Sequence, residues 1–251
     1  MTDDAGMVTH AELLWGLRDG TRRGPKPSLT VEDITRTAIA IADAEGLAAV
    51  SMARVAADLG NSTMALYRYV KSKDELLTLM SDAALELPPQ APPAQGWREG
   101  LTDWAHNVLA AIRRHPWYAQ LPITAPPIGP HNLAWFDKGL GALRDTGLSE
   151  PEKVGIVMGL ITYVHGEIRL GLELAQGFAD NPEAFSSQYG QVLARVVDPR
   201  KLPALHAVVA AGVFAAEVLY DEEEQAGEFD FGLNLYLDGV AAFIDRRTAK
   251  A

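Results

Sequence analysis

The sequence predicts an all-α protein with a small N-terminal part and a larger C-terminal part, and three observations support this prediction. Apolar residues recur at spacings of three and four along most of the chain, as they do on one face of a helix. Ser or Thr precedes several of these periodic segments, in the position of a helix N-cap. Four prolines, Pro88, Pro89, Pro92 and Pro93, interrupt the pattern, and we place the boundary between the two parts there.

Length and composition exclude several classes of protein. The chain has 251 residues, of which 48% are hydrophobic and 22% charged, close to average globular usage. Cysteine is absent, which excludes a disulfide framework and thiolate metal ligands. The longest apolar stretch, Ala207 to Ala216, falls short of the ~20 residues that cross a bilayer. We therefore expect a folded, soluble and cytoplasmic protein.

The charge is unevenly distributed along the chain. Asp and Glu outnumber Lys and Arg by 33 to 22, and the net charge of −11 argues against a surface coated in positive charge. Two short windows nonetheless contain bases and no acids. They hold Arg22, Arg23 and Lys26, and Arg68, Lys71 and Lys73. Such windows also arise by chance, so the surrounding motifs decide their meaning.

The first part is predicted to be an arm followed by a helical domain. Residues 1–28 have no sustained period and are broken by Gly and Pro, so we expect a flexible basic arm. The domain over residues 29–87 begins with a helix from Thr30 to Gly46 that carries an apolar stripe. Three shorter helices follow, with caps at Ser51, at Asn61 or Ser62, and at Ser72.

Residues 96–251 are predicted to form the larger helical domain. Apolar residues with helical spacing run from Trp97 to Val108 and from Leu133 to Leu143. A long helix from about Glu150 to Ala175 and a final helix from about Phe229 to Arg246 complete the domain, with loops between them.

Residues 51–70 have the spacing of a helix-turn-helix. Ala56 is small enough to let two helices cross closely, Gly60 can adopt the turn conformation, and Leu66 can anchor the second helix in the core. The second helix would then face outward, toward a DNA major groove. Two-helix patterns with a glycine turn also occur by chance.

The wider stretch resembles the DNA-binding domain of TetR-type transcriptional regulators. The matching motifs are Asp43-Ala44-Glu45-Gly46, Val55-Ala56-Ala57-Asp58-Leu59-Gly60, and the segment from Ala65 to Leu77 with its Leu-Tyr-x-x-Val-x-x-Lys core. The helical layout of the second part is similar to the family's ligand-binding and dimerisation domain. The resemblance implies a repressor that binds a palindromic DNA operator as a homodimer and is released by a small, largely apolar or aromatic effector.

The resemblance also places DNA contacts at matching positions. Ser51, Met52 and Ala53 would face phosphates, and the recognition helix would present Thr63, Met64, Ala65, Tyr67, Arg68 and Tyr69 to the groove. Arg68 suits a bidentate contact to guanine, with phosphate neutralisation as the alternative. Lys73 would hold the DNA backbone. The basic residues Arg22, Arg23 and Lys26 resemble arms that reach a minor groove or phosphates; the alternative is disorder without function.

Two helices of the second part are predicted to form a dimer interface. A stripe of small residues in the long helix and an apolar stripe in the final helix would pair with their symmetry mates in a four-helix bundle. The alternative is packing within one chain. The stripes consist of Gly155, Gly159, Thr162 and Gly166, and of Leu233, Leu237, Val240 and Ile244.

Aromatic residues gather in the second part, where an effector pocket is expected. The candidate ligand-binding residues are Trp104, Trp117, Trp135, Phe136, Met158, Thr162 and Tyr163, and plain core packing is the alternative. TetR itself presents a histidine and a glutamate to magnesium–tetracycline where this chain has Thr162 and Leu170. The resemblance therefore implies a different effector.

Two other functions remain open at this point. A helical enzyme would use Asp221–Glu224 as metal carboxylates or Gly139–Gly141 as a phosphate loop, but the first looks like a solvated loop and the second lies within a helical pattern. The histidines lack metal-ligand spacing, so we expect no catalytic residue, metal or cofactor. The third function is a protein-interaction module with a vestigial helix-turn-helix, which DNA binding at physiological salt would exclude.

Overall fold

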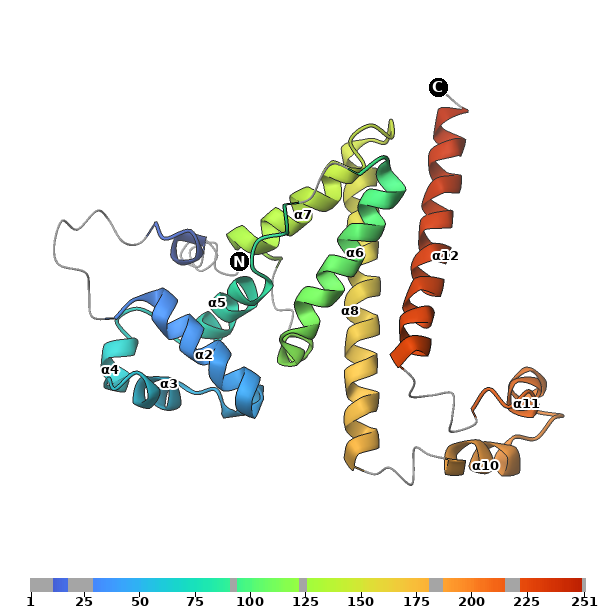
Figure 1. Cartoon of the computed structure of the whole chain (residues 1–251), viewed down its shortest axis with the longest axis horizontal. Helices are drawn as coiled ribbons and strands as arrows, with labels where there is room; N and C mark the ends of the chain where they lie inside the picture. Colours follow the sequence, from blue (N-terminus) through green and yellow to red (C-terminus); the bar gives the residue numbers. More distant parts are fainter. Residues whose placement is uncertain are drawn as a thin grey trace, which may run out of the picture. The chain divides into compact units, whose positions relative to one another are not determined.

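The computed structural model describes residues 11–17, 29–90, 94–121, 126–180, 187–214 and 222–249. Every regular element in these residues is a helix, which confirms the predicted all-α class (Figure 1). The chain divides into two compact units, Met1–Val164 and His165–Ala251, and one long helix runs through both. None of the described helices combines the length and hydropathy that a membrane span needs. Arg22, Arg23 and Lys26 lie outside the described residues.

Four helices form the N-terminal part of the first unit: α2 (Val31–Glu45), α3 (Met52–Asp58), α4 (Thr63–Leu66) and α5 (Lys73–Leu85), with the short 3-10 helix η1 (Leu47–Ala49) after α2. Each α-helix begins at a side-chain cap. The hydroxyls of Thr30, Ser51, Ser62 and Ser72 each accept a hydrogen bond from the backbone N–H three residues later. The predicted starts are therefore confirmed, and of the two candidate caps for α4 the structure uses Ser62.

The recognition helix α4 is shorter than the sequence analysis predicted. Regular α-helix ends at Leu66, and the next residues form a tighter turn in which Arg68 N donates to Ala65 O and Tyr69 N donates to Leu66 O, at 3.3 and 2.9 Å. Leu66 is nevertheless fully buried, as predicted, and so is Val70. The turn that precedes α4 depends on Gly60, whose φ of +63° lies in the left-handed region.

The rest of the first unit consists of α6 (Trp97–Arg113), the 3-10 helix η2 (Pro116–Gln120), α7 (Pro130–Ala142) and the first half of α8 (Glu150–Asp180). Gly139 lies at the contact between these helices, because a Cβ there would come within 3.1 Å of Val157 on α8 and 3.3 Å of the Trp104 ring nitrogen on α6. The segment Gly139–Gly141 is thus part of a packed helix and does not form a phosphate loop.

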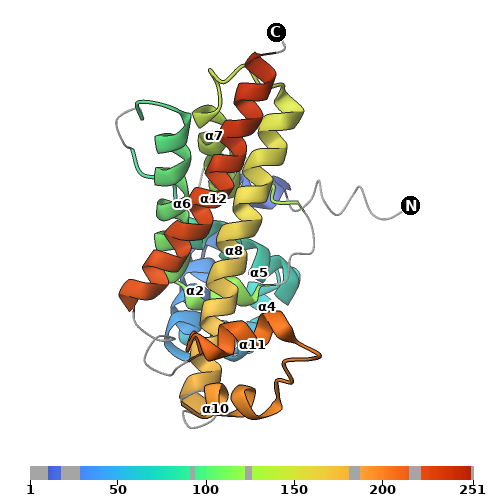
Figure 2. The same ribbon diagram turned by 90° about the vertical axis from the view of Figure 1, so that its right-hand side faces the viewer.

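The second unit contains the end of α8, then α10 (Ser187–Val196), α11 (Pro203–Ala210) and α12 (Glu222–Thr248). Helices α10 and α11 lie side by side, where the sequence analysis expected only loops (Figure 2). Glu222–Glu224 form the first turn of α12, so the prediction of a loop there was wrong.

Candidate nucleic-acid interface

The helix-turn-helix buries one face and exposes the other. Ala56 on α3 and Leu66 on α4 are almost fully buried, as the motif requires. On the outer face, the side chains of Met64 and Tyr67 are 75% and 41% exposed, and Arg68 is exposed as well. These three side chains are therefore accessible to a binding partner.

The arginines away from this surface are neutralised by carboxylates. Arg36 pairs with Asp33. Arg54 donates two hydrogen bonds to Glu45, at 2.7 and 2.9 Å, and a third to Asp58 at 3.0 Å. The hydrogen bonds from Arg54 lower the pKa of the Glu45 carboxyl below its usual value, which keeps this network charged.

The cations beside the recognition turn are not neutralised in this way. Arg68 and Lys73 are exposed and form no ion pair within the described part of the chain. The Nζ of Lys71 donates to the backbone oxygens of Tyr67 and Arg68, both at 3.1 Å, so the end of the recognition turn carries a fixed positive charge. Lys71 belongs to a basic window of the sequence, but its place at the end of the turn could not be predicted, because side-chain contacts with carbonyls leave no sequence pattern.

The other predicted contact residues divide by exposure. Thr63, Ala65 and Tyr69 are half-buried, and Ser51 and Ala53 are exposed at the start of α3. The Ser51 hydroxyl is also the cap of α3, and it accepts from Arg54 N at 3.2 Å. Met52 is an exception, because its side chain is only 6% exposed and packs in the core. A contact from the Met52 side chain to DNA is therefore excluded in this arrangement, although its backbone N–H remains at the helix start.

Asp82 joins the last helix of this domain to the start of α7. Its buried carboxylate accepts hydrogen bonds from His131 N at 3.3 Å, Asn132 N at 2.9 Å and the Asn132 side-chain amide at 3.0 Å. The Nδ1 of His131 lies 3.0 Å from Asp82 Oδ2, within ion-pair distance but without hydrogen-bond alignment. Gly129 makes room for this cap, because a Cβ there would overlap the carboxylate.

A second carboxylate joins α2 to η2. Asp43 Oδ1 lies 2.7 Å from His115 Nδ1 and accepts a hydrogen bond of 2.6 Å from the ring nitrogen of Trp117. Since His115 and Trp117 follow directly after α6, the end of that helix is attached to the DNA-binding domain by this pair of contacts. We call the Asp82 and Asp43 contacts together the junction.

All three predicted ligand-binding tryptophans belong to this junction or adjoin it. Trp117 binds Asp43, as described. The ring nitrogen of Trp135 donates to Leu85 O and Glu86 O, at 3.3 and 3.1 Å, and that of Trp104 donates to Trp135 O at 2.7 Å. All three rings are almost fully buried. Their polar atoms hold α6, η2 and α7 against the DNA-binding domain.

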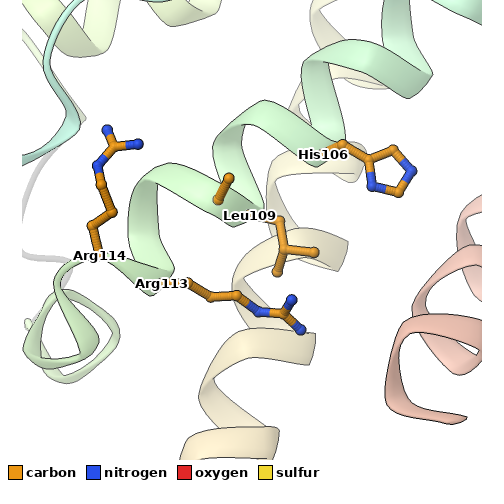
Figure 3. A pocket seen from close by; sticks show the side chains of 5 residues that line it. His106, Leu109, Arg113 and Arg114 are labelled. Carbon is orange, nitrogen blue, oxygen red and sulfur yellow. The ribbon is translucent and has the colours of Figure 1, made fainter. Parts of the chain in front are cut away.

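The remaining predicted ligand-binding residues lie elsewhere. Phe136 and Tyr163 are half-buried, whereas Met158 and Thr162 are exposed on α8. Two cavities of about 470 Å³ each occur in the first unit, and none of the predicted residues lines either of them. One cavity lies on α6, where Figure 3 shows His106, Leu109 and Arg113. The other lies between the proline segment and α7, beside Pro88 and Lys138.

The N-terminal segment is partly attached to the first unit. Residues 11–17 contain one helical turn, in which Leu13 is buried and the ring nitrogen of Trp15 donates to Ile128 O at 2.9 Å. The prediction of a flexible arm over the whole of residues 1–28 is therefore wrong for this segment. This turn could not be predicted from the sequence, because a single helical turn is too short to show a periodic pattern.

The predicted dimer stripes differ in exposure. On α12, Leu233, Leu237 and Val240 are buried by other parts of the same chain, as in the intramolecular alternative, and Ile244 is half-buried. On α8, the small residues remain open. Gly155, Thr162 and Gly166 are exposed, and Gly159 is half-buried.

Comparison with known proteins agrees with this architecture. Residues 34–80 match the family described as bacterial regulatory proteins, tetR family, and residues 88–244 match the tetracyclin repressor-like C-terminal domain. The chain belongs to the TetR family of transcriptional regulators. Members of this family are DNA-binding regulators and not enzymes; they form dimers and bind small-molecule effectors.

Individual relatives are similar over nearly the whole chain. The HTH-type transcriptional repressor DrrR1 of Streptomyces coeruleorubidus is 37% identical, over 96% of this chain and 87% of its own length. An HTH-type transcriptional regulator of Saccharopolyspora erythraea is 29% identical, over 86% of both chains. Among solved structures, ActR of Streptomyces coelicolor in complex with actinorhodin aligns with a TM-score of 0.71 and 26% identity, over 88% of this chain and 99% of ActR.

Proposed function

We propose that this regulator is a homodimeric repressor that binds a palindromic operator through α4 and its following turn, and that a small effector releases it. The observation that carries this proposal is the sorting of charge in the DNA-binding domain. Arg36 and Arg54 are neutralised by carboxylates, while Arg68 and Lys73 are left without ion pairs among the described residues. In a chain of net charge −11, this leaves positive charge next to the recognition turn.

The exposed side chains suit distinct roles at a major groove. Arg68 can donate two parallel hydrogen bonds to guanine, and Met64 offers an apolar contact for a thymine methyl group. Tyr67 can donate its hydroxyl to a phosphate. Lys73, at the first position of α5, can neutralise a backbone phosphate, and Lys71 adds charge at the end of the turn.

A dimer is needed because one such module contacts few bases. Leu233 and Leu237 are buried within the chain and are not available to a second subunit. The large exposed apolar residues in the described part of α12 each lie two positions before one of them. There, Phe231 and Leu235 are 69% and 59% exposed and four residues apart, on one helical face. We propose that these two residues contribute to the interface with the second subunit. The open small-residue stripe of α8 remains a separate proposal for that interface.

DrrR1 is named as a transcriptional repressor, which supports repression over activation. Since the operator would be bacterial chromosomal DNA, we propose that the protein works in the cytoplasm. The effector residues predicted from the sequence remain candidates, with Trp104, Trp117 and Trp135 positioned to pass a change in α6 or α7 to the DNA-binding domain.

The experiment is a gel shift with DNA from upstream of the protein's own gene and of neighbouring genes, titrated with salt against an unrelated competitor duplex. We expect retention of a palindromic site at 0.15 M salt, with affinity that falls steeply as salt rises. Retention no stronger than that of the competitor, at low salt as well, would contradict the proposal. A footprint over a single half-site would leave DNA binding but exclude the palindromic dimer.

A further inference from the structure

We propose that the cavity on α6 is a binding site for the anionic group of an amphipathic aromatic molecule, and that Arg113 pairs with that group. The site would belong to the effector and so rests on the proposed function. Its volume of about 470 Å³ lies within the range of roughly 300–1,000 Å³ found for small-molecule pockets. The cavity is lined by His106, Leu109, Ala110, Arg113 and Arg114.

The lining combines an apolar floor with polar ends on one helical face. His106, Leu109, Ala110 and Arg113 are spaced three, one and three residues apart, so they project from the same side of α6. Figure 3 shows Leu109 between the side chains of His106 and Arg113, and the side chain of Arg114 directed away from that of Arg113. Ala110 is exposed and Leu109 is 7% exposed, so the apolar part of a ligand would lie mainly over Ala110, with its polar group beside Arg113.

The charge of the lining selects an anion. In a chain with 33 acidic residues against 22 Lys and Arg, the cavity is lined by no acidic side chain in the described part of the molecule. Arg114 is engaged elsewhere, because its Nη2 pairs with Glu86 at 3.3 Å. Arg113 has no ion pair among the described residues. The second cavity differs, since it is lined by Asp137 as well as Lys138 and Arg144.

An arginine in this position favours a carboxylate or sulfonate. The guanidinium binds such groups through two parallel hydrogen bonds, and these charge-assisted bonds are stronger than neutral ones. The competing explanation is that Arg113, in the last turn of α6, only stabilises the helix end. That role predicts an effect on stability and none on ligand charge.

The test uses two fluorescent probes that share one ring system and differ in charge. They are 8-anilinonaphthalene-1-sulfonate and its neutral counterpart N-phenyl-1-naphthylamine, titrated into the full-length protein without DNA at 0.15 M salt. We expect the sulfonate to bind at least about tenfold more tightly, a difference of about 1.4 kcal/mol. Arg113→Gln should remove this preference and leave the affinity for the neutral probe unchanged. Arg113→Lys should retain part of the preference for the sulfonate, because lysine keeps the positive charge but cannot form the two parallel hydrogen bonds of a guanidinium.

Arg144→Gln is the matched control, since it removes an arginine from the other cavity. This variant should bind both probes with native affinity. Equal affinity of the two probes for the native protein would overturn the proposal, as would an unchanged preference in Arg113→Gln with native thermal stability. Loss of the preference in Arg144→Gln would instead place the anion in the second cavity. Because the titration contains no DNA, its outcome is separate from that of the gel shift. Failure of operator binding would reject the proposed function and leave the anion site standing.

Discussion

Asp82 on α5 and Asn132 on α7 are joined by two hydrogen bonds, from the backbone N–H at 2.9 Å and from the side-chain amide at 3.0 Å, both to Asp82 Oδ1. The last helix of the DNA-binding domain thus provides the N-terminal cap of a helix in the larger domain. Pro130 at the first turn of α7 and Gly129 before it cannot provide a side-chain cap of their own. The start of α7 therefore depends on a residue about fifty positions earlier.

Removing this carboxylate should destabilise the fold. We expect Asp82→Ala to lower the free energy of unfolding by about 2–3 kcal/mol, because buried N–H donors of His131 and Asn132 lose their acceptor. Asp82→Asn should have a smaller effect, since one oxygen acceptor remains. The measurement is urea or thermal unfolding, with Asp74→Ala on the exposed side of α5 as control. An equal loss in the control variant would show that the cap contributes nothing specific.

Gly129 and Asp82 should be energetically coupled. Gly129→Ala places a methyl group on the carboxylate, so we expect a loss of about 1–3 kcal/mol in the native background. In the Asp82→Ala background the same change should cost less, and a double-mutant cycle measures the difference. Gly141→Ala is the control, because a Cβ there has open space within α7 and should stabilise the helix by up to about 1 kcal/mol. Strict additivity of Gly129→Ala and Asp82→Ala would contradict the coupling.

The two unpaired cations should affect DNA binding differently. Arg68→Ala should weaken operator binding by about 1–3 kcal/mol and relax the base preference at one position, whereas Lys73→Ala should weaken all sequences alike and reduce the salt slope by about one. Arg36→Ala removes an arginine already paired with Asp33, so it should leave the operator affinity, the base preference and the salt slope near their native values. Affinity selection on a randomised operator, combined with salt titration, measures them. Identical effects of Arg68→Ala and Lys73→Ala would refute the assigned roles.

A charge on the exposed face of α12 should prevent dimerisation. We expect Leu235→Asp to raise the dimer dissociation constant by about 100-fold or more, because a buried carboxylate without a partner is costly. Val208→Asp, on the exposed side of α11, is the matched control and should remain dimeric. Sedimentation equilibrium gives both constants. If Leu235→Asp dimerises like the native protein, the interface lies on another face.

His165 should make stability depend on pH near neutrality. Burial lowers the pKa of this histidine below its ordinary 6.5, so the unfolded state binds the proton more readily. Its contribution is present above pH 6.5 and is lost as the pH falls from there toward the folded-state value. His165→Gln should flatten the pH dependence of the melting temperature over this window, and an unchanged dependence in this variant would contradict the assignment. Asp33 and Glu45, whose pKa values are lowered by hydrogen bonds from Thr30 and Arg54, act only in a more acidic range.

The helices with strong caps and clear periodicity could be predicted from the sequence. Thr30, Ser51 and Ser72 give local signals, since a hydroxyl that accepts from the N–H three residues later needs no distant partner. The predicted α2 ends at Gly46, as observed, because a left-handed residue stops a helix wherever it occurs.

What the sequence could not predict depends on tertiary contacts. Met52 and Leu233 fit the patterns of a DNA contact and a dimer stripe, but their burial is decided by neighbours distant in the chain. The same holds for Asp82 and Asp43, whose hydrogen-bond partners lie 49 or more residues away. The cavity on α6 could not be predicted, because the pattern of its lining residues on α6, His106, Leu109, Ala110 and Arg113, is also typical of an ordinary helix with a buried and an exposed side.

The buried tryptophans at the junction have one further consequence. Indole emission depends on the polarity and hydrogen bonding of the ring, and Trp104, Trp117 and Trp135 donate their ring N–H groups within or beside the contacts that hold the DNA-binding domain. Three of the five tryptophans in the chain are placed in this way. The intrinsic emission of the unlabelled protein should therefore change whenever the contacts of these three rings change, without any added label.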